Sequence, residues 1–146
     1  MHPNIIIHWP AIIVTTIVSF AFGGLWYMTL FGNTWAKLMN CDVSKKPEPA
    51  AMRKSFALQV LGLFLMTYVM AHSGQVWRAS VWGAGADQAD HIYGFFNGFF
   101  TWLGFFVPMQ FGKVSWEGRP WKLFVINAGH DFINLQIIGQ ILAHWH

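Results

Sequence analysis

The sequence predicts an all-α integral membrane protein, a four-helix bundle that forms one domain over residues 1–146. Only 10% of its residues are charged, whereas soluble domains carry about 25%. Hydrophobic residues make up 55% of the chain, and nine tryptophans favour membrane interfaces. The net charge of +3 is too small and too scattered to indicate nucleic acid, so the lipid bilayer is the expected partner.

Four apolar stretches are long enough to cross a bilayer. A spanning helix needs about 20 residues, because each adds about 1.5 Å against a core of about 30 Å. The expected spans are residues 10–30, 55–77, 91–112 and 121–143. Pro47 and Pro49 mark the start of the second span, and Pro108 is expected to kink the third.

The distribution of Lys and Arg predicts the orientation. Of the nine cations, all but Arg78 lie in or beside residues 31–54 and 113–120. Positive loops stay in the cytoplasm, so these two loops are expected inside and both termini outside. Residues 33–40 are expected to form a short helix lying in the interface.

A faint internal repeat relates the two halves. Phe20 and Gly24 in the first span recur as Phe100 and Gly104 in the third. The repeat would make two parallel helical hairpins with a pseudo-two-fold axis along the membrane normal. Chance similarity between apolar helices is the alternative.

Several motifs resemble a known family. They are Gly-Gly-Leu-Trp-Tyr at 23–27, Phe-Gly-Asn-Thr-Trp at 31–35, Trp-Leu-Gly-Phe at 102–105, Glu-Gly-Arg-Pro at 117–120 and Leu-Phe-Val-Ile-Asn-Ala-Gly at 123–129. Together they resemble the bacterial small four-span membrane proteins of domain of unknown function 1761. The resemblance implies a four-span fold in the bacterial inner (cytoplasmic) membrane and no particular activity.

The fourth span carries the polar residues that most invite a function. Asp131 lies about 15 Å from the interfacial Trp121 at 1.5 Å per residue, which is the bilayer midplane. A carboxylate there costs about 2.5–3.5 kcal/mol, so pairing, protonation or water must offset it. Asn127, Asp131 and Asn134 share one helix face, and His130 adjoins it.

Two interpretations of this polar face remain open. In the first, His130 and Asp131 relay a proton or an ion. In the second, the polar side chains only bond neighbouring helices, at about 0.6 kcal/mol per contact. The expected partners in the second and third spans are Gln59, Thr67, Asn97 and Thr101.

Glycines and a charged turn indicate how the helices pack. Gly94, Gly98 and Gly104 in the third span are expected at close helix contacts. Glu117 and Arg119 are expected to form an exposed ion pair in a tight cytoplasmic turn, worth under about 1 kcal/mol.

Histidines gather at the predicted outer surface. His8, His72, His144 and His146 are candidate ligands for Zn or Cu, with axial haem ligation as a weaker alternative. Their spacing is not diagnostic, and histidine also suits a membrane interface. Cys41 is the single cysteine, and no catalytic motif is present.

The sequence therefore favours a non-enzymatic membrane component with no required cofactor. It would be a small channel or transporter, as a homo-oligomer, or an accessory subunit of a larger membrane complex. The alternative is a metal- or haem-binding redox protein that uses the outer histidines.

Overall fold

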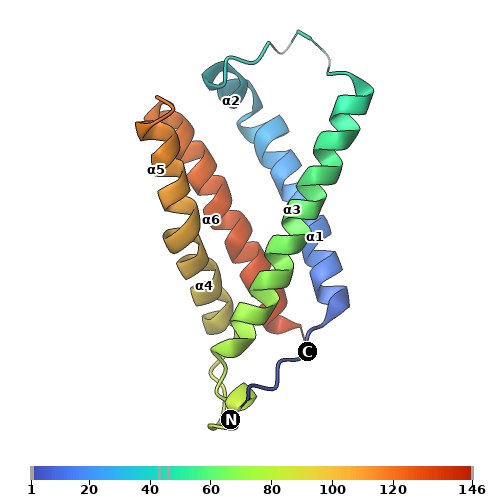
Figure 1. Ribbon diagram of the computed structural model, residues 1–146, viewed down its shortest axis with the longest axis vertical. Helices are drawn as coiled ribbons and strands as arrows, with labels where there is room; N and C mark the ends of the chain where they lie inside the picture. The colour runs from blue at the N-terminus through green and yellow to red at the C-terminus, as the bar shows by residue number, and fades with distance from the viewer. Residues whose placement is uncertain (1, 43, 46, 146) are drawn as a thin grey trace.

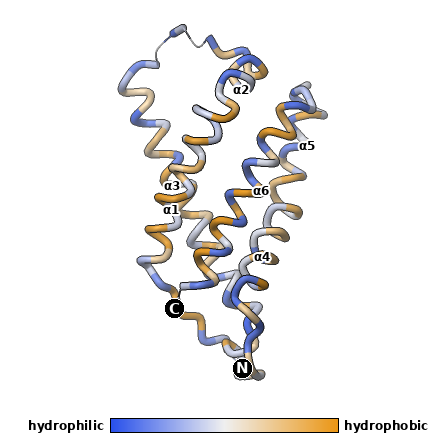
Figure 2. The backbone as a smooth tube through the Cα atoms, turned by 180° about the vertical axis from the view of Figure 1, so that it is seen from behind, coloured by the Kyte–Doolittle hydropathy of each residue, from blue (hydrophilic) through white to orange (hydrophobic). Residues whose placement is uncertain are grey.

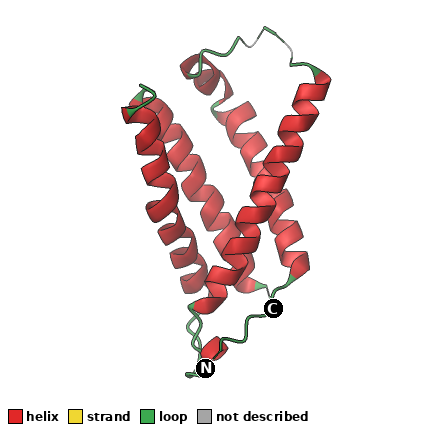
Figure 3. Cartoon of the chain, viewed as in Figure 1, coloured by secondary structure: helices red, strands yellow, loops and turns green. Residues whose placement is uncertain are grey.

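The computed structural model describes residues 2–42, 44–45 and 47–145, and within them the chain is all-α with no strand (Figure 3). The elements, in chain order, are α1 (Trp9–Gly24), η1 (Leu25–Leu30), α2 (Gly32–Leu38), α3 (Pro49–Val76), η2 (Ser80–Trp82), α4 (Asp90–Thr101), η3 (Trp102–Phe106), α5 (Val107–Ser115) and α6 (Trp121–His144).

The long helices run up and down between two ends of the molecule (Figure 1). Both termini and the α3–α4 connection lie at one end, called the terminal end. Helix α2, the α2–α3 connection and the α5–α6 turn lie at the other, called the loop end. Helices α1 and α3 cross near the middle and diverge toward the loop end, where α3 stands apart from α5 and α6.

Three helical segments have the length and hydropathy of membrane spans. They are Trp9–Leu30, Pro49–Val76 and Asp90–Ser115. Helix α6 has 24 residues, or about 36 Å at 1.5 Å each, and runs beside them. Hydrophilic residues interrupt its apolar stretch, as Figure 2 shows, so α6 is not among the three segments with the hydropathy of a span.

The helix boundaries differ from expectation mainly in α3. The second span was expected from residue 55, but the helix begins at Pro49, whose fixed φ suits a first turn. The expected interfacial helix is present as α2, Gly32–Leu38. Pro108 lies in the first turn of α5, directly after a change in helix type.

The change of helix type before α5 is a π-helical segment, and the described part of the chain has two such segments. Segment η1 continues α1, and segment η3 joins α4 to α5. A π segment widens the helix locally and re-aims the side chains that come after it, and such segments often occur at functional sites. Trp26 and Trp102, one from each segment, both contact the polar stretch of α6.

Helix α4 packs against α6 through backbone contact. A Cβ at Gly98 would lie 2.6 Å from the carbonyl oxygen of Leu135, and one at Gly94 would lie 2.9 Å from that of Gly139. The expectation of close packing at Gly104 was wrong, because nothing lies within 4 Å of a Cβ built there. Beside this contact, Met70 of α3 joins Leu135 and Ile138 in the core.

Gly98→Ala is therefore expected to destabilise the fold by about 1–3 kcal/mol, because backbone cannot move aside as a side chain can. Gly62→Ala on α3 is the matched control, since nothing lies within 4 Å of a Cβ at that position. Thermal unfolding in detergent measures both variants. Equal melting temperatures for the two would contradict the α4–α6 contact.

Candidate functional site

A cleft of about 700 Å³ lies between α1, α3, α5 and α6 at the loop end. Helices α1, α3, α5 and α6 contribute its walls, together with η1, α2 and the α5–α6 turn. Its polar and charged lining residues are Ser19, Tyr27, Ser55, Gln59, Gln110, Lys113, Glu117, Arg119, Asn127, His130 and Asp131. The predicted polar face of α6 thus faces a cavity inside the bundle.

The floor of the cleft is a hydrogen-bonded carboxylate. One oxygen of Asp131 accepts from Gln110 Nε2 on α5 at 3.0 Å. The other lies 3.2 Å from Nδ1 of His130. An ionised Asp131 accepts both bonds, which leaves Nε2 of a neutral His130 as a proton acceptor. The two groups are neighbours in sequence, but their side chains converge across the helix surface.

Aromatic rings from α1 and η1 enclose His130. Phe22 stacks on it at 5.4 Å between centroids, Tyr27 is tilted at 4.8 Å and Trp26 meets it edge-on at 6.0 Å. Three aromatic rings thus surround the imidazole. Among the described residues, Nε2 of His130 is buried and has no hydrogen-bond partner.

Two tryptophans hold the polar stretch of α6 from opposite sides. Trp26 Nε1 donates to the carbonyl of Ile126 at 3.2 Å, and Trp102 Nε1 donates to that of Ala128 at 2.8 Å. Both tryptophans belong to π segments. Tyr27 adds a bond from its hydroxyl to Asn127 Oδ1 at 3.1 Å. These bonds fix the position of His130 and Asp131 along the bundle.

The mouth of the cleft carries both signs of charge. Arg119 Nε lies 3.6 Å from a Glu117 oxygen, so the predicted ion pair is present in the α5–α6 turn. Gly118 between them has φ = 65°, a left-handed conformation that suits glycine. Lys113 lies on the same rim, which therefore has a net positive charge.

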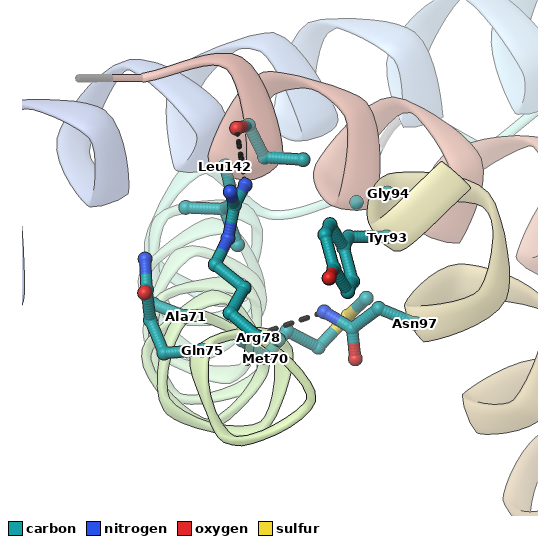
Figure 4. A pocket seen from close by; sticks show the side chains of 11 residues that line it. Met70, Ala71, Gln75, Arg78, Tyr93, Gly94, Asn97 and Leu142 are labelled. Atoms are coloured by element: carbon teal, nitrogen blue, oxygen red, sulfur yellow. Dashed lines mark hydrogen bonds between the residues drawn. The ribbon is translucent and has the colours of Figure 1, made fainter. Parts of the chain in front are cut away.

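The terminal end is closed by a buried arginine. Arg78, only 8% exposed, contacts Asp87 at 3.4 Å and Asp90 at 2.8 Å, and it donates to the carbonyl of Ala143 on α6 at 2.8 Å. Its guanidinium lies 4.8 Å from the centre of the Tyr93 ring. One side chain thus joins the α3–α4 connection to the start of α4 and the end of α6, as Figure 4 shows in part.

Comparison with known proteins places this chain in a family. The profile of the family described as "Protein of unknown function (DUF1761)" matches residues 10–143. The chain belongs to this family. No curated protein and no solved structure matches it significantly. Because the family description names no activity, the function of this DUF1761 protein must be inferred from its residues.

Four of the eight predicted polar residues line the cleft, and Gln59 is the one predicted partner among them. Gln59 lines the cleft, while no hydrogen bond joins Thr101 to the Asp131 site within the described part of the chain. Asn97 instead donates to the carbonyl of Met70 at 3.0 Å and accepts from Ser73 at 3.0 Å. The partner that Asp131 does have, Gln110, was not predicted.

The outer histidines of this DUF1761 protein do not gather into a metal site. His72 and His144 each bond through Nδ1 to a carbonyl of their own helix, at 2.9 Å in both cases. His8 lines a separate pocket, and His146 lies outside the described residues. Over the described ranges, no three His, Cys, Asp or Glu side chains converge as metal ligands would.

The stability of the closed terminal end should depend on pH. The hydroxyl and the backbone N–H of Ser80, followed by Arg78, hold the pKa of Asp87 below its usual value. A carboxylate with a lowered pKa stabilises the fold above the unfolded-state value of about 3.9, and this contribution is lost as pH falls through the lower folded value.

Asp87→Asn should therefore weaken thermal stability near neutral pH and flatten its decline below about pH 4. The measurement is the melting temperature in detergent as a function of pH. Glu48→Gln, which removes a carboxylate at the loop end, is the control and should leave the decline in place. A decline of unchanged steepness in Asp87→Asn would show that Asp87 is not tied to the fold.

Proposed function

We propose that this protein is a four-span membrane transport protein that takes up and releases a proton at Asp131 and His130. The observation that carries the proposal is a carboxylate bonded to an imidazole at the floor of a cleft, inside a bundle of apolar helices. Ionisable groups at membrane depth are costly and commonly serve proton or ion pathways. A purely structural bond between helices needs no acid.

The four-span topology rests on α6 as well as the three apolar helices. Both termini lie at the same end of the bundle, which requires an even number of crossings. Helix α6 is long enough to cross, and its polar side chains point into the bundle instead of toward lipid. The cationic loops support an orientation with the loop end in the cytoplasm of a bacterial cell and the cleft opening inward.

The site has the groups that proton binding requires. His130 Nε2 accepts a proton, and the resulting imidazolium is stabilised by the Asp131 carboxylate at Nδ1. Tyr27 faces the pair from η1, Gln110 from α5 and Gln59 from α3, while Lys113, Glu117 and Arg119 stand at the mouth.

The two ends of the bundle supply the asymmetry that transport needs. The loop end is open to the site, and the Arg78 contacts close the terminal end. Passage of a proton therefore needs a route from the cleft past Arg78 to the terminal end. The π segments η1 and η3 lie beside the site, in the first and third spans.

Proton flux into proteoliposomes tests the proposal. Asp131→Asn keeps an acceptor for Gln110 but cannot exchange a proton, so flux should fall by at least about 100-fold, the usual contribution of a positioned acid–base group. Glu117→Gln, which removes a carboxylate at the cleft mouth, is the matched control and should retain flux.

Monodisperse elution of both variants establishes that they fold. Unchanged flux in a well-folded Asp131→Asn protein would leave the pair with a structural role only. Absence of flux in the wild-type protein, with or without a pH gradient, would overturn the proposed function altogether.

A second candidate function is that of a subunit in a homo-oligomer or a larger membrane complex. It is favoured by phenylalanines on α4 and η3 that face away from the bundle. Phe95 and Phe99 stack in parallel at 5.8 Å between ring centroids, as do Phe96 and Phe100 at 5.7 Å, and Phe105 is 68% exposed. Ordered rings of this kind suit a protein partner as well as lipid.

Phe96→Ala together with Phe100→Ala should then release the partner during purification in mild detergent while the bundle stays folded. Val125→Ala, at an exposed position on α6, is the control. Size and composition by native mass spectrometry measure the outcome. A wild-type protein that is monomeric in every mild detergent would rule this candidate out.

A further inference from the structure

Five buried polar atoms have no hydrogen-bond partner within the described part of the chain. They are Thr15 Oγ1, Ser19 Oγ, Thr67 Oγ1, His130 Nε2 and Asn134 Oδ1. Their residues are between 0% and 8% exposed, so neither lipid nor bulk water reaches them. Buried polar groups in proteins are almost always bonded, to protein or to ordered water, so each of these atoms requires a partner.

Most of the five lie along one seam between α1 and α6. A Cβ at Gly23 of α1 would lie 3.6 Å from His130 Nε2, which sets the register of the two antiparallel helices. Ser19 and Thr15 lie one and two turns from Gly23 toward the terminal end. Asn134 lies one turn from His130 in the same direction. The unbonded atoms therefore extend from the cleft floor toward the closed end.

Polar groups continue beyond the seam. Thr67 of α3 lies one turn before Met70, whose carbonyl accepts from Asn97. Asn97 and Met70 line a cavity of about 20 Å³ together with Gln75 and Arg78, as Figure 4 shows. About 10–15 Å³ of such space is enough for one water molecule, and this cavity has polar groups to bond it.

A surface pocket lies at the terminal end, next to these polar groups. Gln75 and Arg78 also line a pocket of about 260 Å³ at the terminal end, with His8, Ser80 and Asp87. Arg78 does not make this end positive, because it contacts the two carboxylates of Asp87 and Asp90. Polar residues thus occur at successive levels between the cleft at the loop end and the open pocket at the terminal end.

We infer that internal water molecules bond these five atoms and connect His130 to the terminal end as a proton path. The inference rests on the proposed function, since it supplies the route by which Asp131 and His130 exchange protons with the outer side. In one passage, a seam water delivers a proton to His130 Nε2, the Nδ1 proton of the resulting imidazolium moves to the Asp131 carboxylate, and Asp131 releases it to water in the cleft. The imidazole is then left with its one proton on Nε2. It turns about its Cβ–Cγ bond, and Nε2 loses this proton to cleft water while Nδ1 takes one up from cleft water, so no proton returns to the seam.

The competing explanation is that the hydroxyls bond to their own helices. Thr16, the neighbour of Thr15, does so, donating to the carbonyl of Ile12 at 2.7 Å. A threonine or serine bonded in this way needs no water. The two explanations predict different effects on proton flux when the hydroxyls are removed.

Proteoliposome flux with paired variants decides between them. Thr15→Val with Ser19→Ala should lower proton flux by about tenfold, the factor that corresponds to one lost hydrogen bond. Thr16→Val is the control, because its hydroxyl is already bonded, and it should leave flux unchanged. Equal flux in both variants, while Asp131→Asn abolishes it, would overturn the path and leave the proposed function standing.

Hydration is measured independently by radiolytic labelling in ¹⁸O water. Met70 is 2% exposed, so it should gain ¹⁸O only if a water molecule occupies the cavity beside it. Met52, 41% exposed near the loop end, is the positive control. Labelled Met52 with unlabelled Met70 would overturn the inference even if the flux variants fail to fold or the wild-type protein carries no protons.

Discussion

The structure depends on one constraint: the polar side chains of α6 have to find their partners among helices whose outer faces are apolar. Asp131 meets that constraint with Gln110 and His130, and Asn127 meets it with Tyr27. The indoles of Trp26 and Trp102 then hold the same stretch of helix. The other helices are arranged around these bonds, with α4 brought to backbone contact by Gly94 and Gly98.

The same constraint accounts for the difference between the two ends. At the loop end the polar groups of α6 face a cleft, where α3 diverges from the other helices. At the terminal end the polar groups bond directly, with Arg78 joining two carboxylates and a helix carbonyl. An open end and a bonded end around a central acid are the features that support a transport role.

Three of the expected apolar spans and the close approach of Gly94 and Gly98 to α6 could be predicted from periodicity and composition. The partner of Asp131 could not, because Gln110 lies on a helix whose rotation depends on η3, and no sequence pattern indicated a π segment. Arg78 was expected only as a loop cation, although Asp87 and Asp90 nearby were a usable signal. The spacing of Thr15, Ser19 and Gly23 was a similar signal, since it marks one face of α1.

The central claim is that His130 and Asp131 exchange a proton within the membrane. Solid-state NMR of ¹⁵N-histidine-labelled protein in bilayers tests it most directly, with His130→Gln used to assign the signal. The account predicts that Nε2 changes from unprotonated to protonated as the pH is lowered, while the ring stays beside the Asp131 carboxylate. A His130 signal that does not change with pH would contradict it.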